Sequence, residues 1–553
     1  MSTGELRVGV VGAGTMGAGI AQVAAASGCA VSLYDVSVAS AERGRARIAE
    51  SLERQVARGR LTAEERDAAL GRLTVVTDLA ALADATLVIE AATEQLTLKR
   101  ELFAALEGVC APTAILASNT SSLSIGEIAR DLAHPERVVG LHFFNPAPAQ
   151  ELVEVIGGAR TAPETITRAA NFARQLGKTP VRALDTPGFI VNRVARPFGG
   201  EALRLVAEGV ATPAEIDRIV RAAGFPMGPC ELADLVGLDV SLAVTQALYE
   251  QTFGESRFRP HPWQARMVAA GTLGRKTGQG FYRYEGGERV ADARPSPFSE
   301  VVALTRRANV LIAGQGDAVD DLALALHARG LGVSTYSTEE SAPLVNAGIP
   351  RASRLRDVLM TTTVAIEATL GPRELKRAYW FELDEALPPQ IPILSLALGH
   401  GATELGSWSS RPQRVLGLGL AGPFDTVPII ELARGFHTTD AVLIRAVAFA
   451  RSLGKEVAVV GDPPGQVLTR ILACLINEAA FALEEGIASI EAIDTALRLG
   501  MRHPLGPGEW SARLGLERVI TTLDGLHAYY GEERYRVAPR LRRASQAGES
   551  QLR

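Results

Sequence analysis

The 553-residue chain contains one sequence pattern twice, and this repeat constrains its fold more than any other feature. Residues 138–146 read Val-Val-Gly-Leu-His-Phe-Phe-Asn-Pro and recur at 415–423 as Val-Leu-Gly-Leu-Gly-Leu-Ala-Gly-Pro. The same offset of 277 positions relates Glu90 to Glu367, Lys99 to Lys376, Lys178 to Lys455, Glu201 to Glu478 and Asp217 to Asp494. A constant register over this length predicts two halves of similar fold.

The second copy lacks the polar residues that look catalytic in the first. At the offset of 277 positions, Ser121, His142 and Asn192 are replaced by Leu398, Gly419 and Thr469. What the two copies share is mostly scaffold. We therefore expect the chemistry in the first copy and a structural role for the second.

Composition indicates a globular protein of several domains. Hydrophobic residues make up 47% of the chain and charged residues 22%, and the length predicts three or four domains. A net charge of −5 without basic blocks argues against nucleic acid or an anionic membrane as a partner. The scattered cysteines favour reduced thiols and predict no metal site. Since we find neither a leader before the first strand nor an apolar run of about 20 residues, we expect a soluble, cytoplasmic protein.

The N-terminus carries the pattern of a dinucleotide-binding turn. An apolar strand at 7–11 precedes Gly12, Gly14 and Gly17, and the next strand ends in Asp35. Gly12 permits a tight turn, Gly14 lets a pyrophosphate approach the backbone, and Gly17 lets the helix pack closely on the sheet. A carboxylate at position 35 accepts ribose hydroxyls of NAD and repels the 2′-phosphate of NADP. The residues of this turn expected to line NAD are Gly12, Gly14, Thr15, Met16, Gly17 and Asp35.

Residues 35–77 are polar and predict a helical hairpin inserted into the nucleotide-binding domain, with Thr62 as an N-cap. Its arginines suit a phosphorylated ligand, but the neighbouring glutamates are equally consistent with a solvated helix face. The hairpin is expected only in the first copy. The second glycine turn, at 314–316, lies 302 positions after the first, so about 25 residues are missing before Glu367.

The second turn also lacks the residues that suit NAD. Val319 replaces the third glycine, and Ser337 replaces the acid. We therefore expect a nucleotide-type fold there without an NAD site.

The first half resembles the 3-hydroxyacyl-CoA dehydrogenase family over residues 5–284. The motifs that carry the resemblance, in order, are the glycine turn, Ile89-Glu90-Ala91, and residues 117–123, 140–146, 185–193 and 278–282. The duplicated second half resembles the long bacterial form, seen in 3-hydroxybutyryl- and 3-hydroxyadipyl-CoA dehydrogenases. The resemblance implies an α/β Rossmann domain and an all-α domain, followed by a degenerate second copy of both.

His142 is the expected base. Oxidation of a secondary alcohol by NAD requires a group that accepts the hydroxyl proton, and the pKa of a histidine suits this. His142 ends an apolar strand, where doubly wound sheets bind their ligands. Glu154 lies among apolar residues of the next strand-like run and needs a partner, for which an imidazole is suited. Glu431 persists without a histidine, so we also expect a structural partner for Glu154.

Ser121 and Asn192 are expected to donate hydrogen bonds to the substrate oxygens. By resemblance, Glu94, Lys99, Asn145 and Lys276 approach NAD, while Ser51 and Arg58 approach CoA.

The expected domains are a Rossmann domain (1–186), a helical substrate and dimerisation domain (187–284), a linker (285–304), a degenerate Rossmann-like domain (305–435) and a second helical domain (436–553). The resemblance implies NAD-dependent oxidation of (3S)-3-hydroxyacyl-CoA in β-oxidation, hydroxybutyryl-CoA or phenylacetate-type catabolism. It also implies an acyl-CoA thioester as partner and a homo-oligomer or an internal pseudo-dimer. Two alternatives stay open: a dehydrogenase of another 3-hydroxy acid, which would generally use a lysine where Asn192 lies, and a non-enzymatic NAD-binding protein.

Overall fold

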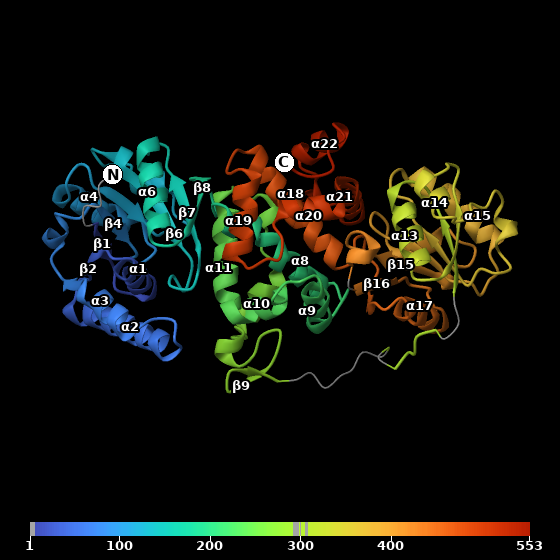
Figure 1. Ribbon diagram of the computed structural model, residues 1–553, viewed down its shortest axis with the longest axis horizontal. Helices are drawn as coiled ribbons and strands as arrows, with labels where there is room; N and C mark the ends of the chain where they lie inside the picture. Colours follow the sequence, from blue (N-terminus) through green and yellow to red (C-terminus); the bar gives the residue numbers. More distant parts are fainter. Residues whose placement is uncertain (1–5, 291–297, 299, 305–307, 428) are drawn as a thin grey trace. The chain divides into compact units, whose positions relative to one another are not determined.

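The computed structural model describes residues 6–290, 298, 300–304, 308–427 and 429–553. The chain, whose helices and strands are labelled in Figure 1, divides into two compact units. The first contains residues Met1–Val194 together with Ala482–Arg502, and the second contains Ala195–Phe481 together with His503–Arg553.

The first unit is built on an eight-stranded sheet. Its strands are β1 (Arg7–Val11), β2 (Ala30–Tyr34), β3 (Leu73–Val76), β4 (Leu87–Glu90), β5 (Ile115–Ser118), β6 (Val138–Phe143), β7 (Leu152–Gly157) and β8 (Thr179–Leu184). They lie in the order β3-β2-β1-β4-β5-β6-β7-β8, and all neighbours are parallel except β6 and β7. The strand order reverses between β1 and β4, which is where doubly wound sheets bind ligands.

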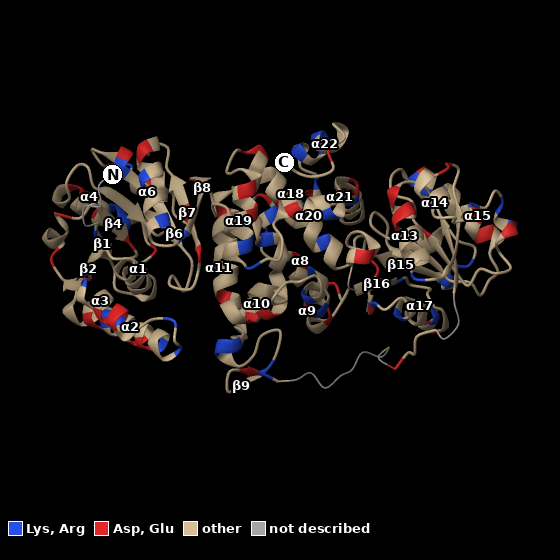
Figure 2. Cartoon of the chain, viewed as in Figure 1, with Lys and Arg blue, Asp and Glu red and all other residues tan. Residues whose placement is uncertain are grey.

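Helices pack around this sheet because their apolar faces complete its core. They are α1 (Thr15–Ala26), α4 (Leu96–Val109), α5 (Ile125–Ile128) and α6 (Pro163–Gln175). The expected hairpin consists of α2 (Val38–Ala57) and α3 (Ala63–Gly71), and Thr62 forms a capping box with Glu65 at the start of α3. Both basic and acidic residues occur along the hairpin helices (Figure 2).

Two more helices complete the first unit. The short helix α7 (Val191–Val194) follows β8, and α19 (Ile490–Gly500) comes from the second copy of the repeat. Residues up to Val194 of the first copy therefore share a compact unit with Ala482–Arg502 of the second copy.

The second unit contains a seven-stranded sheet. Its strands are β11 (Asn309–Ala313), β12 (Gly332–Tyr336), β13 (Val364–Glu367), β14 (Ile393–Leu396), β15 (Val415–Gly419), β16 (Ile429–Arg434) and β17 (Glu456–Val460), in the order β12-β11-β13-β14-β15-β16-β17. Its helices are α13 (Asp317–Ala328), α14 (Ala342–Asn346), α15 (Arg373–Ala386), α16 (Ala402–Ser407) and α17 (Asp440–Ser452). Only the five-residue α14 stands between β12 and the next 3-10 turn, so the hairpin is missing from this copy as expected.

The expected boundary at residues 435 and 436 is wrong. Strand β17 pairs with β16 along Glu456–Val460, and α17 packs against both strands. The second sheet therefore continues for more than twenty residues past the expected boundary, and the helical part begins with α18.

The other helices of the second unit come from both copies. The first copy supplies α8 (Arg196–Ala207), α9 (Pro213–Ala222), α10 (Pro229–Val236), α11 (Leu238–Gln251) and α12 (Pro262–Ala269). The second copy supplies α20 (Pro507–Leu514), α21 (Leu516–Tyr530), α22 (Pro539–Gln546) and most of α18 (Leu468–Glu484), whose last turn lies in the first unit. Short 3-10 helices occur at Leu79–Leu82, Pro135–Arg137, Ser256–Phe258, Arg275–Thr277, Leu355–Asp357, Pro412–Arg414, Phe424–Thr426 and Glu533–Tyr535.

The expected linker is partly structured. Its start forms an antiparallel hairpin of β9 (Tyr284–Glu285) and β10 (Glu288–Arg289), and Val301 packs on the core of the second sheet. Residues 291–297 and 299 of the linker lie outside the described residues. Within the described part of the chain, no single helix is long and apolar enough to cross a membrane; α10 and α11 reach that length only together, across a 97° bend. The expected fold class, a Rossmann domain and a helical domain followed by a second copy, is confirmed.

Candidate active site in the first copy

The glycine turn between β1 and α1 has the geometry expected for a dinucleotide. Gly12 has a φ of +101°, and a Cβ there would lie 2.7 Å from the carbonyl oxygen of Ala91. A Cβ on Gly17 would lie 1.8 Å from the carbonyl oxygen of Gly12, so α1 can approach the turn only with glycine at that position. A Cβ on Gly14 would meet nothing within 4 Å. The N-terminus of α1, where Thr15 and Met16 begin the helix, is therefore open to a phosphate group.

Asp35 lies directly after β2, at the carboxyl edge of the sheet. Its Oδ2 accepts a hydrogen bond of 2.9 Å from the backbone N–H of Ala13, which ties the carboxylate to the glycine turn. The next residue, Val36, is 82% exposed and carries no charge that would balance a phosphate. These residues fit the adenosine ribose of NAD.

His142 and Glu154 face each other across two antiparallel strands. They are register partners on β6 and β7, and this pairing places their side chains on one face of the sheet. The His142 Nδ1 and Glu154 Oε2 atoms are 2.6 Å apart, and both side chains are buried. The rings of Phe144 and Phe189 pack against the imidazole, with centroid distances of 4.5 and 5.9 Å. The imidazole is thus fixed in orientation, and its Nε2 is the nitrogen left for a substrate.

The second oxygen of Glu154 holds the start of α7. Glu154 Oε1 accepts hydrogen bonds of 3.0 and 2.9 Å from the backbone N–H groups of Ile190 and Val191. The next residue in this helix is Asn192, whose Nδ2 lies 3.4 Å from the carbonyl oxygen of Ser121. All four residues expected to be catalytic lie within the first unit: Ser121, His142, Glu154 and Asn192. Glu154 connects His142 to α7. Asn192, on α7, contacts Ser121.

Glu94 holds the loop that carries Ser121. Its Oε1 accepts hydrogen bonds from the Thr120 hydroxyl at 2.7 Å and from the backbone N–H groups of Ser121 and Ser122 at 2.9 and 3.2 Å. Burial opposes ionisation, but the Thr120 hydroxyl, the Lys99 ammonium and the Ser121 N–H together lower the pKa of Glu94. The carboxylate therefore stays charged and keeps the loop in place.

Lys99 is buried beneath this loop. Its Nζ lies 2.6 Å from Glu90 Oε1 and 3.2 Å from Glu94 Oε2, and its side chain is 1% exposed. The structure thus connects Glu94 and Lys99 to the Ser121 loop, a role that their expected assignment to NAD did not include.

The other residues expected to bind ligands are Asn145, Ser51, Arg58 and Lys276. Asn145 is exposed just beyond β6. Ser51 lies on α2, and Arg58 is the C-cap residue that directly follows this helix. Lys276 belongs to the second unit, where its Nζ pairs with the carboxylate of Asp239 at 2.5 and 2.7 Å.

Comparisons with known proteins agree with this geometry. Residues 7–186 and 309–463 match the model of the 3-hydroxyacyl-CoA dehydrogenase NAD binding domain, and residues 188–284 and 465–553 match the model of the C-terminal domain of the same family. The chain belongs to the 3-hydroxyacyl-CoA dehydrogenase family. The expectation of an NAD-dependent oxidoreductase that acts on 3-hydroxyacyl-CoA is confirmed.

Individual relatives match either the whole chain or its first half. The chain is 40% identical to 3-hydroxyadipyl-CoA dehydrogenase of Escherichia coli K12, over 97% of this chain and 96% of that protein. It is 44% identical to a probable 3-hydroxybutyryl-CoA dehydrogenase of Bacillus subtilis, which matches 50% of this chain over 96% of its own length. A crystal structure of 3-hydroxybutyryl-CoA dehydrogenase from Escherichia coli K12 aligns with a TM-score of 0.74 and 37% identity, over 98% of this chain and 99% of that one.

In the second copy of this dehydrogenase, the place of the imidazole is filled by a glutamine. A Cβ on Gly419, the counterpart of His142, would lie 2.6 Å from Gln466 Oε1. The Gln466 amide donates a 3.0 Å hydrogen bond to the carbonyl oxygen of Ala397 and is fully buried. Leu398 and Thr469, the counterparts of Ser121 and Asn192, are buried as well. This copy has no room for the catalytic groups of the first.

The second glycine turn also differs from the first in its side chains. Asp317 lies in the first turn of α13, whereas the first turn of α1 has no acid. Gln315 Oε1 accepts hydrogen bonds from the hydroxyls of Thr338 and Tyr379 at 3.0 and 3.3 Å. Deeper in the fold the scaffold is retained, since Lys376 and Ser395 contact Glu367 as Lys99 and Ser118 contact Glu90.

Sequence reasoning missed Asp185, which organises the loop after Ser121. Its carboxylate accepts hydrogen bonds from the Ser124 hydroxyl at 2.7 Å and from the backbone N–H groups of Ile125 and Gly126 at 3.0 and 2.7 Å. The available signal was an acid directly before the Thr186-Pro187-Gly188 turn. Sequence reasoning also missed every contribution of the second copy to the first unit.

Proposed function

We propose that His142 is the base that removes the hydroxyl proton when this dehydrogenase oxidises the 3-hydroxyl of a (3S)-3-hydroxyacyl-CoA. The hydroxyl proton passes to His142 Nε2 while the C3–H bond breaks and the carbonyl forms. Glu154 Oε2 keeps the ring oriented through Nδ1 and stabilises its charged form. NAD, held by the glycine turn and Asp35, supplies the chemistry of hydride acceptance.

Ser121 and Asn192 orient the substrate in this proposal. The Asn192 side chain lies next to the backbone of Ser121 in the first unit. Ser121 and Asn192 each carry a hydrogen-bond donor suited to a hydroxyl or a thioester carbonyl. Ser51 on α2 and Arg58 at its C-cap are proposed to contact CoA, where the guanidinium of Arg58 suits a phosphate. Glu94 and Lys99 support the Ser121 loop, and Asn145 is proposed to approach NAD.

The observation that carries the proposal is the His142–Glu154 pair, buried on adjacent strands and present in the copy whose glycine turn is tied to Asp35. In the second copy Glu431 keeps the place of Glu154, but Gln466 fills the space of the imidazole.

The test measures NADH oxidation with acetoacetyl-CoA, 3-oxohexanoyl-CoA and 3-oxoadipyl-CoA, and with the corresponding free acids. We expect turnover of at least one thioester and none of the free acids. Equal turnover of a free acid would favour the alternative class of 3-hydroxy acid dehydrogenases. NADH binding without any turnover would favour a non-enzymatic role. The same series establishes the acyl preference, on which the names of the two full-length relatives differ.

We also propose that the second copy serves as an internal dimer partner. In the first unit Arg193 forms an ion pair with Glu485 at 2.7 Å, and in the second unit Arg470 forms one with Glu208 at 2.8 Å. These pairs are counterparts at the offset of 277 positions, with the two partners exchanged between copies. The backbone repeats this exchange: Leu184 N–H donates to Ile487, and Gly461 N–H donates to Val210.

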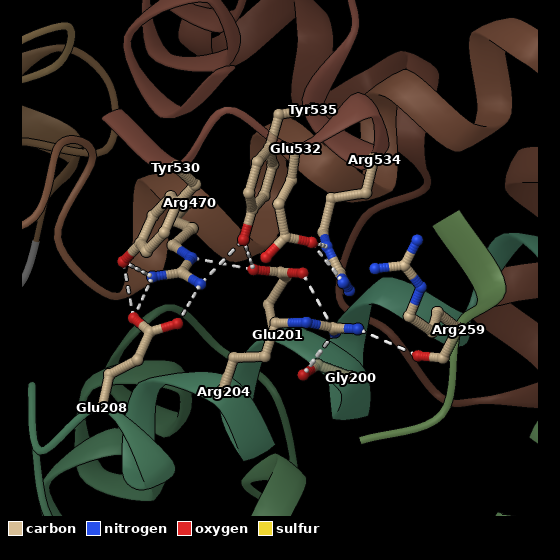
Figure 3. A network of polar contacts seen from close by, with 10 residues as sticks. All are labelled: Gly200, Glu201, Arg204, Glu208, Arg259, Arg470, Tyr530, Glu532, Arg534 and Tyr535. Carbon is tan, nitrogen blue, oxygen red and sulfur yellow. Dashed lines mark hydrogen bonds and ion pairs between the residues drawn. The ribbon is translucent and has the colours of Figure 1, made fainter. Parts of the chain in front are cut away.

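Such reciprocal pairing, in which i contacts j and j contacts i, is the pattern of an isologous interface. Figure 3 shows its second-unit half, where Arg470 lies between Glu201 and Glu208 beneath the hydroxyls of Tyr530 and Tyr535. The helices of one chain thus make with each other the contact that two identical subunits would make.

A further inference from the structure

The segment Ala482–Arg502 of the second copy is part of the same compact unit as the catalytic residues. Within this unit α19 packs against α7 and against the strands β7 and β8. Strand β7 carries Glu154, and α7 carries Asn192. The segment therefore contacts both elements that bring catalytic groups together.

Helix α7 needs external contacts to keep its place. It comprises four residues, and an isolated helix of one turn has no stability of its own in water. Its N-terminal end is fixed by Glu154 Oε1, through the N–H groups of Ile190 and Val191. This contact leaves the rotation of the helix, and with it the direction of Asn192, dependent on further contacts.

Glu485 supplies one of these contacts. Its two carboxylate oxygens each accept a hydrogen bond of 2.7 Å from the guanidinium of Arg193, the residue that follows Asn192. Arg193 is 4% exposed, so its side chain has little freedom. A bidentate pair fixes orientation as well as distance, and here it fixes the side of α7 next to Asn192.

Two more contacts hold this region: one is made by the backbone of Ile487, and the other is the close packing of α19 at Gly500. Leu184, the last residue of β8, donates its N–H to the carbonyl oxygen of Ile487 at 3.0 Å. A Cβ on Gly500 would lie 2.9 Å from Leu152 Cδ2 and 3.2 Å from Val191 Cγ2. Helix α19 therefore sits as close to β7 and α7 as a glycine allows.

We infer that the second copy completes the active site of the first, with Glu485 as a positioning residue that acts through Arg193 on Asn192. The inference rests on the proposed role of Asn192 in orienting the substrate. The second copy lacks catalytic residues of its own, but it would contribute to turnover by positioning a residue of the first copy.

The chain offers a matched control for this inference. Glu208 makes the equivalent ion pair with Arg470 in the second unit, where the counterpart of Asn192 is the buried Thr469. Glu485→Gln and Glu208→Gln therefore remove the same kind of interaction from the two halves of one interface. Gly500→Ala perturbs the same helix from another side without changing a charge.

The experiment compares kcat and KM for acetoacetyl-CoA, the dissociation constant of NADH and the thermal midpoint in the full-length chain. We expect Glu485→Gln and Gly500→Ala to lower kcat/KM for acetoacetyl-CoA by roughly tenfold, since small displacements of a positioned group are costly. The dissociation constant of NADH should change by less than about twofold in Glu485→Gln and Gly500→Ala. In Glu208→Gln, kcat/KM should also change by less than about twofold. The inference would be overturned if kcat/KM fell equally in Glu485→Gln and Glu208→Gln, in proportion to a lowered thermal midpoint. That result would show a merely structural role for Glu485.

A double substitution separates this inference from the proposed function. If Glu485 acts through Asn192, adding Glu485→Gln to Asn192→Ala should cause no further loss of kcat/KM. Additive losses would overturn the inference while leaving the role of Asn192 intact. Full activity of Asn192→Ala itself would overturn the role of Asn192, and absence of turnover in the unmodified chain would overturn the proposed function.

Discussion

Glu154 and Glu431 lie 277 positions apart and hold the same structural contact in the two copies. Each buried carboxylate accepts hydrogen bonds from two consecutive backbone N–H groups at the start of a helix, those of Ile190 and Val191 for Glu154 and those of Val467 and Leu468 for Glu431. Glu154 additionally contacts His142. The structural contact therefore exists without the histidine, as we expected from the sequence. The contact with the histidine was either gained in the first copy or lost in the second.

The first prediction concerns the base. His142→Ala should lower kcat by about 10²- to 10⁴-fold, the usual contribution of a positioned general base. NADH should still bind, because the glycine turn and Asp35 are untouched. Stopped-flow turnover and fluorescence titration with NADH measure the two effects. A variant that keeps more than about a tenth of the rate would refute the assignment.

The second prediction concerns the choice of cofactor. We expect kcat/KM to be at least about tenfold higher with NADH than with NADPH, since Asp35 repels the 2′-phosphate. Asp35→Ser, which copies Ser337 of the second turn, should narrow this ratio by weakening NADH. Equal efficiencies of the unmodified enzyme with both cofactors would contradict the prediction.

The third prediction is a stoichiometry. The second glycine turn has Ser337 in place of Asp35, and Asp317 at the start of α13 opposes a phosphate, so isothermal titration calorimetry should find one NAD bound per chain. Asp35→Ala serves as the control, because weakening the first site should reduce all of the measured heat. A second binding event in this variant would show that the degenerate copy still binds the cofactor.

The fourth prediction concerns residues 1–284 alone. This fragment contains Arg193 and Glu208, which face Glu485 and Arg470 in the full chain. Since the four residues form reciprocal pairs, two fragments can pair Arg193 of one with Glu208 of the other. Light scattering should therefore find self-association or aggregation, which Arg193→Ala should alter. A monomeric fragment with full activity would contradict both the internal dimer and the inferred role of Glu485.

The fifth prediction is a dependence of stability on pH. Burial raises the pKa of Glu431 from its ordinary 4.5 to about 7, although two backbone hydrogen bonds oppose the shift. The folded chain thus holds a proton that the unfolded chain releases between these pH values, so the free energy of unfolding should fall as pH rises from about 5 to 8. Glu431→Gln should remove this part of the decline, on the order of 3 kcal/mol.

Urea unfolding followed by tryptophan fluorescence can measure the effect, because Trp380, Trp408 and Trp510 all belong to the second copy. The comparison is made at pH 5 and pH 8 in both proteins. An equal pH dependence with and without Glu431 would rule out this carboxyl as its source.

The parts of the fold that follow from local pattern were predictable. The glycine turn, the hairpin with its Thr62 cap and the strand of His142 each depend on residues close in sequence. The His142–Glu154 pair was also within reach, because it joins two adjacent strands only twelve residues apart. The extent of the second sheet was missed because α17 separates β16 from its partner β17 in the sequence. The counterpart of β17 in the first copy, β8, would have placed the boundary after β17.

The contacts of Glu485 could not be predicted in the same way. Its partner Arg193 lies 292 positions away, and neither residue has a local pattern that indicates the other. Glu94 and Lys99 were identified as members of the site by resemblance. The bonds of Glu94 to the Ser121 loop and its ion pair with Lys99 depend on how β4, α4 and that loop meet in space. Tertiary placement, which the sequence pattern does not contain, determines both cases.

The reciprocal pairs of Arg193 with Glu485 and Arg470 with Glu208 have a consequence for how this enzyme changes over generations. In a homodimer, a codon change alters both sides of the interface and both active sites at once. Here each side has its own codon, so one side can lose its histidine while the other stays unchanged. Joining two subunits into one chain thus removed the requirement that they remain identical.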